Sequence, residues 1–189
     1  MRRFVVLGLF GLILSLAFFA PSGRDTSASH HNPILFVHGY TSSASAWDTM
    51  TARFLADGWE SNYLYAYTFS STKSNASIAQ DVANRVNEIK AATGAAKVDI
   101  IAHSMGSLSS RYYLKNLGGT ASVDDWVSLG GPNHGTTWAW GCAFLTPCLQ
   151  MTPGSSFAGN IGTVGVRCQG PAPPELWTGN ADIIDPERE

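Results

Sequence analysis

Short uninterrupted apolar runs alternate along this chain with segments in which apolar residues recur at helical spacing. The runs predict strands, and the amphipathic segments, which end at glycines, predict helices. Strands that alternate with helices form βαβ units, so the pattern predicts a mostly parallel sheet. Because the strand runs lack apolar–polar alternation, we expect them to be buried on both faces, inside a three-layer α/β/α sandwich. The strands are expected at 34–37, 63–69, 97–102 and 123–132, and the helices at 45–58, 77–94 and 105–119.

The composition is that of an ordinary globular domain. The 189 residues are 44% hydrophobic, which is enough for one domain with a sizeable core. A net charge of −2, without a basic or an acidic run, argues against a nucleic-acid partner. The histidines lack the spacing of metal ligands, so neither a metal site nor another cofactor is expected.

The N-terminal segment has the pattern of an export signal followed by a linker. Arg2 and Arg3 precede an uncharged apolar run at 4–20, which is typical of a secretory signal peptide. Cleavage is expected between residues 20 and 28, so that residues 1–20 are removed and a disordered linker reaches residue 31. The protein would then be extracellular. The alternative is a membrane anchor, because the run is only slightly shorter than the ~20 residues of a spanning helix.

The three cysteines, Cys142, Cys148 and Cys168, bear on the compartment. In an oxidising environment Cys142 and Cys148 can close a short loop by a disulfide. Cys168 is then left over, and an odd cysteine in a secreted chain suggests a missing partner.

The strand at 97–102 runs directly into a serine flanked by small residues, in the pattern Ala102-x-Ser104-x-Gly106. A serine between a buried strand and a helix can occupy a strained turn, the nucleophile elbow, which lifts its hydroxyl clear of the sheet. Small residues two positions before and after it relieve the crowding. The following helix directs backbone N–H groups at the site, where they favour a developing oxyanion. The alternative is a serine that only caps the helix.

A second oxyanion donor is expected from the end of the first strand, where Gly39 allows the chain to turn close to the active centre. The backbone amides of Tyr40 and Met105 would then form the oxyanion hole. His38 is interpreted as a buried histidine bonded to backbone rather than as a general base, and His103 as facing away from the serine hydroxyl.

These motifs resemble those of small secreted bacterial lipases of the α/β-hydrolase fold. The chain is similar to the Ala-x-Ser-x-Gly lipases of bacilli and actinomycetes, and segment 141–157 resembles the actinomycete branch. The resemblance implies a minimal hydrolase core at 32–158, esterolysis of acylglycerols and no large lid. It also implies that Ser104 is the nucleophile, with Tyr40 and Met105 as oxyanion donors. The motifs occur in the family's order at 33–40, 97–107, 112–119 and 127–136.

The order of the catalytic residues in this fold is Ser, then Asp or Glu, then His. Asp182 resembles the family's acid and Asp185 is the second choice; the alternative for Asp182 is a solvated carboxylate in a frayed tail. No histidine follows Asp182, and His134 would serve as base only by an unusual route, since its motif resembles a loop-shaping element.

We therefore expect a fold that is incomplete at its C-terminus. Apart from a short strand near 181–186, segment 159–189 is expected to be an irregular, mobile tail that leaves a sheet edge partly open. The five histidines are His30, His31, His38, His103 and His134.

Together these features predict a secreted serine ester hydrolase of the lipase type that acts through an acyl-enzyme and is impaired by the lack of a triad histidine. Its substrates would be lipids or small esters, met transiently at a lipid–water interface, and the protein would be a monomer. The alternative from another class is a catalytically inactive binding module that presents the apolar segment 137–149. A serine peptidase or acyltransferase on the same fold is a third alternative.

Overall fold

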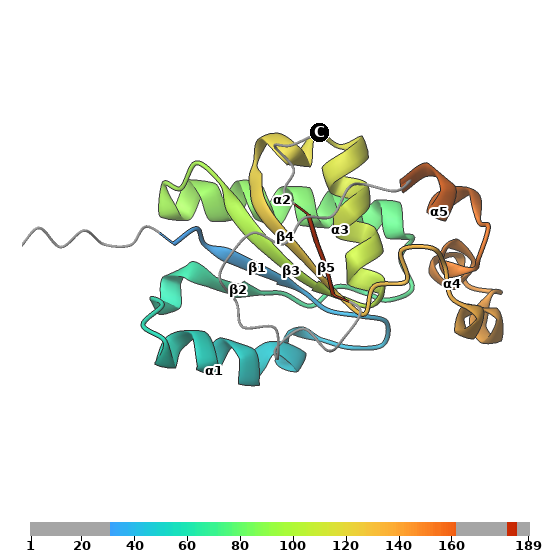
Figure 1. Cartoon of the computed structure of the whole chain (residues 1–189), viewed down its shortest axis with the longest axis horizontal. Coiled ribbons are helices and arrows are strands. Elements are labelled where there is room, and N and C mark those ends of the chain that lie inside the picture. The colour runs from blue at the N-terminus through green and yellow to red at the C-terminus, as the bar shows by residue number, and fades with distance from the viewer. Residues whose placement is uncertain (1–30, 162–180, 185–189) are drawn as a thin grey trace, which may run out of the picture. The chain divides into compact units, whose positions relative to one another are not determined.

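A five-stranded sheet lies at the centre of the structure (Figure 1). The computed structural model describes residues 31–161 and 181–184. The first four strands in spatial order are parallel, and the fifth pairs antiparallel with its neighbour. The expected mostly parallel sheet is therefore confirmed. The spatial order is β2 (Leu64–Ala66), β1 (Ile34–Val37), β3 (Val98–His103), β4 (Val123–Leu129) and β5 (Ala181–Ile184).

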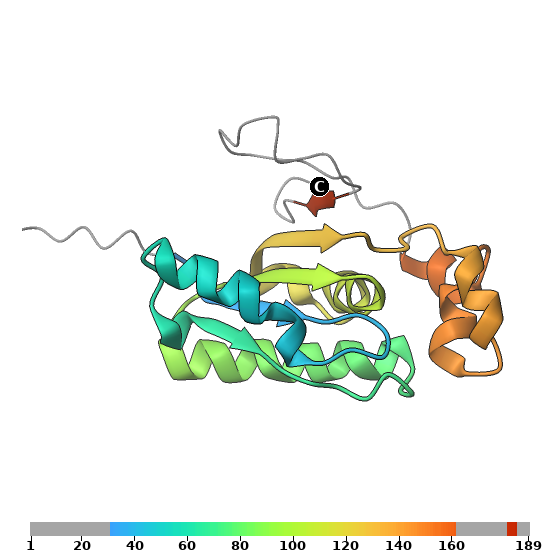
Figure 2. The same ribbon diagram turned by 90° about the horizontal axis from the view of Figure 1, so that it is seen from below.

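Helices cover both faces of this sheet, and Figures 1 and 2 show α1 and α2 on opposite sides of it. Leu35 and Val37 of β1 pack into one core with α2 and α3. Ile34 and Phe36 belong to the other core, which contains Trp47 and the partly buried side chains of α1. The predicted three-layer arrangement is confirmed. The helices are α1 (Asp48–Ala56), α2 (Asn75–Thr93) and α3 (Met105–Asn116).

Strand β3 is covered less evenly than β1. Ile100 and Ala102 are fully buried on the side of α2 and α3, whereas Ile101 is half-buried and His103 is exposed. Ile101 only borders the second core, which is centred on β1. The expectation of burial on both faces is right for β1 and wrong for β3. An apolar run shows which residues can be buried, but not whether a helix lies over them.

Local capping sets the limits of the longest helix. The hydroxyl of Ser74 accepts a hydrogen bond from the Ser77 amide, so α2 begins two residues before its predicted start. Its end at Gly94 is as predicted, because this glycine adopts a left-handed φ of 73° and its amide donates to the Lys90 carbonyl. Strand β2 is shorter than predicted, since its ladder with β1 contains only three residue pairs.

Beyond β4 the chain forms short helices that the sequence pattern does not predict. They lie at the end of the sheet to which the parallel strands point (Figure 2). A disulfide between Cys142 and Cys148 joins the first two of them. They are the 3₁₀-helix η4 (Thr137–Cys142), α4 (Thr146–Met151) and α5 (Ser156–Ile161).

The C-terminal segment is described only in part. Residues 159–161 end α5, and residues 181–184 form β5, where the sequence predicts a short strand. The rest of the expected tail lies outside the described residues, as do the expected signal peptide and the linker up to residue 30. Within the described residues, no helix has both the length and the apolar character needed to cross a bilayer.

Candidate active site

Ser104 occupies the turn between β3 and α3 with backbone angles that serine rarely adopts. Its φ is 52° and its ψ is −123°. A backbone conformation of this kind costs ~1–3 kcal/mol and persists only where its surroundings enforce it. The Ser104 amide donates to the carbonyl of Leu129 in β4, and the Ser104 carbonyl accepts from the Ser107 amide, both at 3.0 Å. The turn is thus held from both sides.

Two glycines allow the end of β1 to pass directly against this turn. A Cβ atom added to Gly39 would lie 2.9 Å from the Cβ of Ser104, and one added to Gly106 would overlap the carbonyl oxygen of His38. Any larger side chain at either position would therefore push β1 and α3 apart. The small residues around Ser104 therefore have two effects. They relieve the local crowding expected from the sequence, and they allow β1 and α3 to pack closely.

The backbone amides of Tyr40 and Met105 lie next to Ser104 and donate no hydrogen bond within the described residues. Tyr40 follows Gly39, which touches Ser104. Met105 is the first residue of α3, where N–H groups have no acceptor inside the helix. Free amides at a helix N-terminus favour negative charge nearby. Within the part of the chain that the structure describes, these two amides are therefore unused donors beside the serine.

His38 is fully buried, and both of its ring nitrogens are used. The Phe69 amide donates to Nε2 at 3.1 Å, so Nδ1 carries the proton and donates to the Gly39 carbonyl at 2.8 Å. The ring also stacks on Phe69, with centroids 3.7 Å apart. Burial lowers the pKa of His38 from its usual 6.5, opposed by the bond to Gly39. His38 is a neutral residue that holds the Gly39 peptide in place, in agreement with its interpretation from the sequence.

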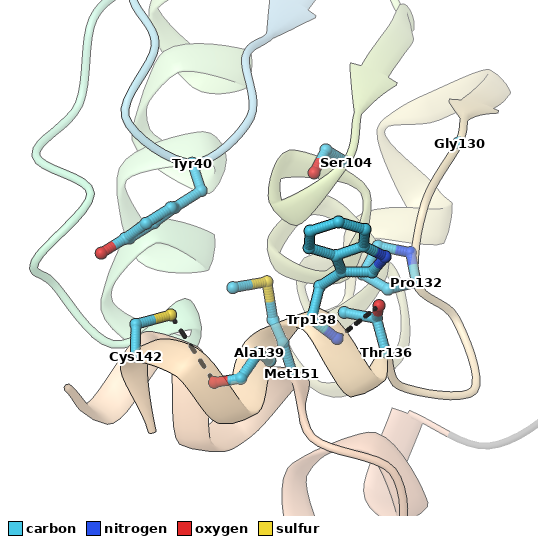
Figure 3. Close-up of a pocket in the computed structure, with 9 residues that line it drawn as sticks. All are labelled: Tyr40, Ser104, Gly130, Pro132, Thr136, Trp138, Ala139, Cys142 and Met151. Carbon is cyan, nitrogen blue, oxygen red and sulfur yellow. Dashed lines mark hydrogen bonds between the residues drawn. The ribbon is translucent and has the colours of Figure 1, made fainter. Parts of the chain in front are cut away.

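A pocket of about 300 Å³ opens beside Ser104 (Figure 3). Figure 3 shows Trp138, Met151 and Tyr40 arranged around the space in front of the serine. None of the lining side chains is charged, and most are apolar, so the pocket suits a hydrocarbon chain better than a charged group. The lining residues are Tyr40, Ser104, Gly130, Pro132, Thr136, Trp138, Ala139, Cys142 and Met151.

The other histidines considered as bases do not bond to Ser104. His103 lines a second cavity of about 360 Å³ together with Trp47 and Arg53 of the α1 side, away from the first pocket. His134 is exposed in the turn after β4. Within the described residues, no hydrogen bond joins the Ser104 hydroxyl to a histidine. The described residues also contain no cluster of aspartate, glutamate, histidine and cysteine side chains that could hold a metal ion.

Asp182 lies within β5 rather than in a loop. Its Cα pairs with that of Ser128 in β4, and Ser128 pairs with Ala102 in β3. Because β5 is antiparallel to β4, the chain after Asp182 runs away from the end of the sheet that carries the elbow. The alternative acid, Asp185, and the odd Cys168 lie outside the described residues. The role of Asp182 stays a prediction.

The sequence analysis did not identify the residues of η4 and α4 that form walls of the pocket beside Ser104. Trp138 and Met151 line the pocket. Both lie in segments that the sequence analysis singled out, 137–149 and 141–157, but it did not place either residue beside Ser104. A signal was available, because no Asp, Glu, Lys or Arg occurs between Asp125 and Arg167 in a chain with 14% charged residues. An uncharged stretch of this length indicates an apolar pocket or surface. Which of its residues reach Ser104 depends on how η4 folds back.

The sequence range that contains all of these features matches one protein family. The lipase (class 2) family matches residues 31–156, which is more than half of the chain and includes Ser104. The chain belongs to the class 2 lipase family.

Solved structures of lipases share the fold of this chain. A mature lipase from Bacillus licheniformis is 22% identical with a TM-score of 0.58, over 69% of this chain and 60% of that one. Lipase B from Aspergillus fumigatus is 19% identical with a TM-score of 0.61, over 77% of this chain and 36% of that one. A phospholipase from Legionella pneumophila is 17% identical with a TM-score of 0.58, over 69% and 33%. The α/β-hydrolase fold is thereby confirmed, and this chain spans less than two thirds of each relative.

The contribution of His38 to the folding stability should fall as the pH decreases below about 6.5, because burial lowers the pKa of His38 in the folded protein. The pKa of His38 is lower in the folded than in the unfolded chain, so the unfolded chain binds more protons in this range. Its contribution is complete above the unfolded pKa and is lost as the pH falls through the folded pKa. In urea unfolding, the free energy of unfolding of the unmodified protein should decrease relative to that of His38→Asn between about pH 7 and pH 5.

Asp99 contributes in the opposite direction in this range. Burial raises its pKa to about 6, so the folded protein binds this proton more readily than the unfolded chain and gains stability as the pH falls. Asp99 is present in the unmodified protein and in His38→Asn. The difference between their curves of unfolding free energy against pH therefore reports the contribution of His38. Parallel curves over this range would contradict the neutral, doubly bonded state of the imidazole.

Gly106→Ala should lower the free energy of unfolding by about 1–3 kcal/mol. The new Cβ would collide with the backbone carbonyls of Val37 and His38, which cannot retreat unless β1 moves. Gly159→Ala in α5 is the matched control, because a Cβ atom there meets nothing within 4 Å. Urea unfolding measures both variants, and an equal effect of the two would rule out close packing at the elbow.

Proposed function

We propose that this class 2 lipase chain is a serine ester hydrolase whose nucleophile is Ser104. The observation that carries the proposal is the strained Ser104 turn, placed between two free backbone amides and an apolar pocket. Strain at a single polar residue is maintained at functional sites and is unnecessary for a serine that only caps a helix. The membership of the family supports ester chemistry.

In the proposed reaction, Ser104 Oγ attacks the carbonyl carbon of an ester and passes its proton to a general base. The amides of Tyr40 and Met105 stabilise the resulting oxyanion. The ester bond then breaks, the protonated alcohol leaves, and the acyl group stays on Oγ. Water attacks this acyl-enzyme and releases the carboxylic acid. The apolar pocket would hold the acyl chain, so we propose lipids or small esters as substrates.

None of the described histidines is placed to act as the general base in this reaction. His38 has no free ring nitrogen, and neither His103 nor His134 is hydrogen-bonded to the serine. Asp182 is proposed as the acid that would orient a histidine. As long as no histidine reaches Ser104, the oxyanion hole and binding alone would provide ~10³–10⁴-fold acceleration over water. We therefore propose that this chain hydrolyses esters weakly by itself.

The competing proposal is a catalytically inactive binding module on the same fold, favoured by the serine without a histidine partner. A fluorophosphonate probe separates the two, because it labels an activated serine. We expect slow labelling at Ser104 and slow hydrolysis of tributyrin, because only the oxyanion donors assist the serine. Both should be abolished in Ser104→Ala and unchanged in Ser45→Ala, which alters an exposed serine outside the site. Labelling of the unmodified chain no faster than that of Ser104→Ala would favour the inactive module.

We also propose that the protein is secreted and monomeric, and that residues 1–20 are its signal peptide. Arg2 and Arg3 followed by an uncharged apolar run support this, and so does a disulfide, which persists in oxidising compartments. Mass spectrometry of protein from the culture medium should find an N-terminus between residues 21 and 29. Protein that still begins at Met1 and sediments with membranes would favour an anchor instead.

A further inference from the structure

Asn75 is a fully buried polar residue that the proposed reaction does not use. It is the first residue of α2, and its side chain lies between α3 and α4. A buried amide is costly unless its polar atoms are paired. Both polar atoms of this side chain are paired, and their partners belong to different helices. The residue therefore joins elements that are far apart in the sequence.

The side-chain amide of Asn75 connects two helices through its opposite ends. Its Oδ1 accepts a hydrogen bond from the Ser109 hydroxyl of α3 at 2.8 Å. Its Nδ2 donates to the Pro147 carbonyl at 3.2 Å and to Gln150 Oε1 at 3.1 Å, both in α4. The Asn75 backbone amide also donates to this Gln150 oxygen, at 2.7 Å. A carbonyl only accepts, so Nδ2 must face Pro147 and the orientation of the amide is fixed. We name these four residues the Asn75 bracket.

The two helices that the bracket joins carry different sides of the candidate active site. Helix α3 begins directly after Ser104, and α4 ends with Met151, which lines the pocket. Figure 3 shows Met151 across the pocket from Ser104. Figures 1 and 2 show that α2 begins at the end of the sheet where α4 lies. The bracket therefore bears on the separation between the serine and the opposite wall of its pocket.

The other contacts of α4 fix this separation less directly. The disulfide between Cys142 and Cys148 ties α4 to η4, and the Met151 carbonyl accepts from the Thr136 amide. Both bonds remain within the segment after β4, so that segment could shift as one body. Cys148 and Met151 are also buried in the main core. Apolar packing is not directional, whereas hydrogen bonds are, so the bracket is the contact that can hold α4 at a set place against α3.

We propose that Asn75 is a positioning residue that sets the width of the Ser104 pocket and so the length of the acyl chain that the pocket accepts. Asn75 does not line the pocket, so it acts through α4 and not by touching substrate. Without the bracket, α4 would move relative to α3 and the pocket would hold a long chain less tightly. The turn at Ser104 would keep its shape, because β1 and β4 hold it. The statement about chain length rests on the proposed hydrolase function, whereas the position of α4 does not.

A matched pair of variants at Gln150 tests the bracket without altering a fully buried residue, since Gln150 is half-buried. Gln150→Glu keeps an oxygen for the two N–H groups of Asn75. Gln150→Met removes that oxygen at similar size and helix propensity. The second-order rates of Ser104 labelling are measured with an ethyl and a decyl fluorophosphonate.

In Gln150→Met the ratio of the decyl rate to the ethyl rate should fall about tenfold, as if about two methylene groups had left the pocket. The change should lie in the half-saturating concentration of the decyl probe and not in its maximal rate. Gln150→Glu should keep the ratio of the unmodified chain. Ser109→Ala should lower the ratio as Gln150→Met does, and the double variant should fall little further, because the bracket fails when either end is released.

Ile89→Ala controls for a general loss of stability. Ile89 is buried near the other end of α2, away from α4, so this variant should destabilise the fold and leave the ratio unchanged. A ratio in Gln150→Met equal to that of the unmodified chain would overturn the proposal. The same decrease in Gln150→Glu or in Ile89→Ala would also overturn it.

Hydrogen exchange separates this proposal from the hydrolase function. The backbone amides of α4 should exchange faster in Gln150→Met than in Gln150→Glu, while those of β3 exchange equally in the two. If neither probe labels the unmodified chain, the hydrolase function and the claim on chain length are lost, and faster exchange in α4 would still support the positioning by Asn75. If labelling succeeds and exchange in α4 does not differ, the positioning role is lost and the hydrolase function stands.

Discussion

The close approach between the end of β1 and the start of α3 is the constraint on which the site depends. Gly106 brings the first turn of the helix against the carbonyls of Val37 and His38, and Gly39 touches Ser104 from the other side. This packing leaves the serine in a conformation that it would not adopt in a free peptide. Because Tyr40 directly follows Gly39 in the turn after β1, the same contact brings its backbone amide close to Ser104 and Met105. A larger residue at either glycine would separate all three.

The polarity of the site comes from peptide groups rather than from charged side chains. No charged residue lines the pocket, and His38 is neutral because it is buried and bonded to two backbone groups. Fixed N–H groups beside apolar side chains would interact more strongly with a developing negative charge than N–H groups in bulk water. Their positions are set by β1 and α3, so little reorganisation would accompany the formation of an oxyanion.

The segment after β4 belongs both to the interior and to the surface. Ala139 and Cys148 are part of the main core, while Trp138 and Phe144 face outward. The disulfide links Cys142 to the buried Cys148 and so ties η4 to α4 and to the core. The result is a rigid, uncharged wall that borders the serine on one side and solvent on the other.

The sequence by itself determined the parts of the protein that depend on neighbouring residues. The order of strands and helices, the end of α2 at Gly94 and the turn at Ser104 follow from apolar spacing and small residues, which act over a few positions. Tertiary structure decided what depends on residues far apart in the chain. It left Ile101 half-buried and His103 exposed on one face of β3, set β5 antiparallel to β4, and folded Trp138 and Met151 back to the serine. Local patterns do not contain these outcomes, because each is set by contacts between segments that the pattern treats as independent.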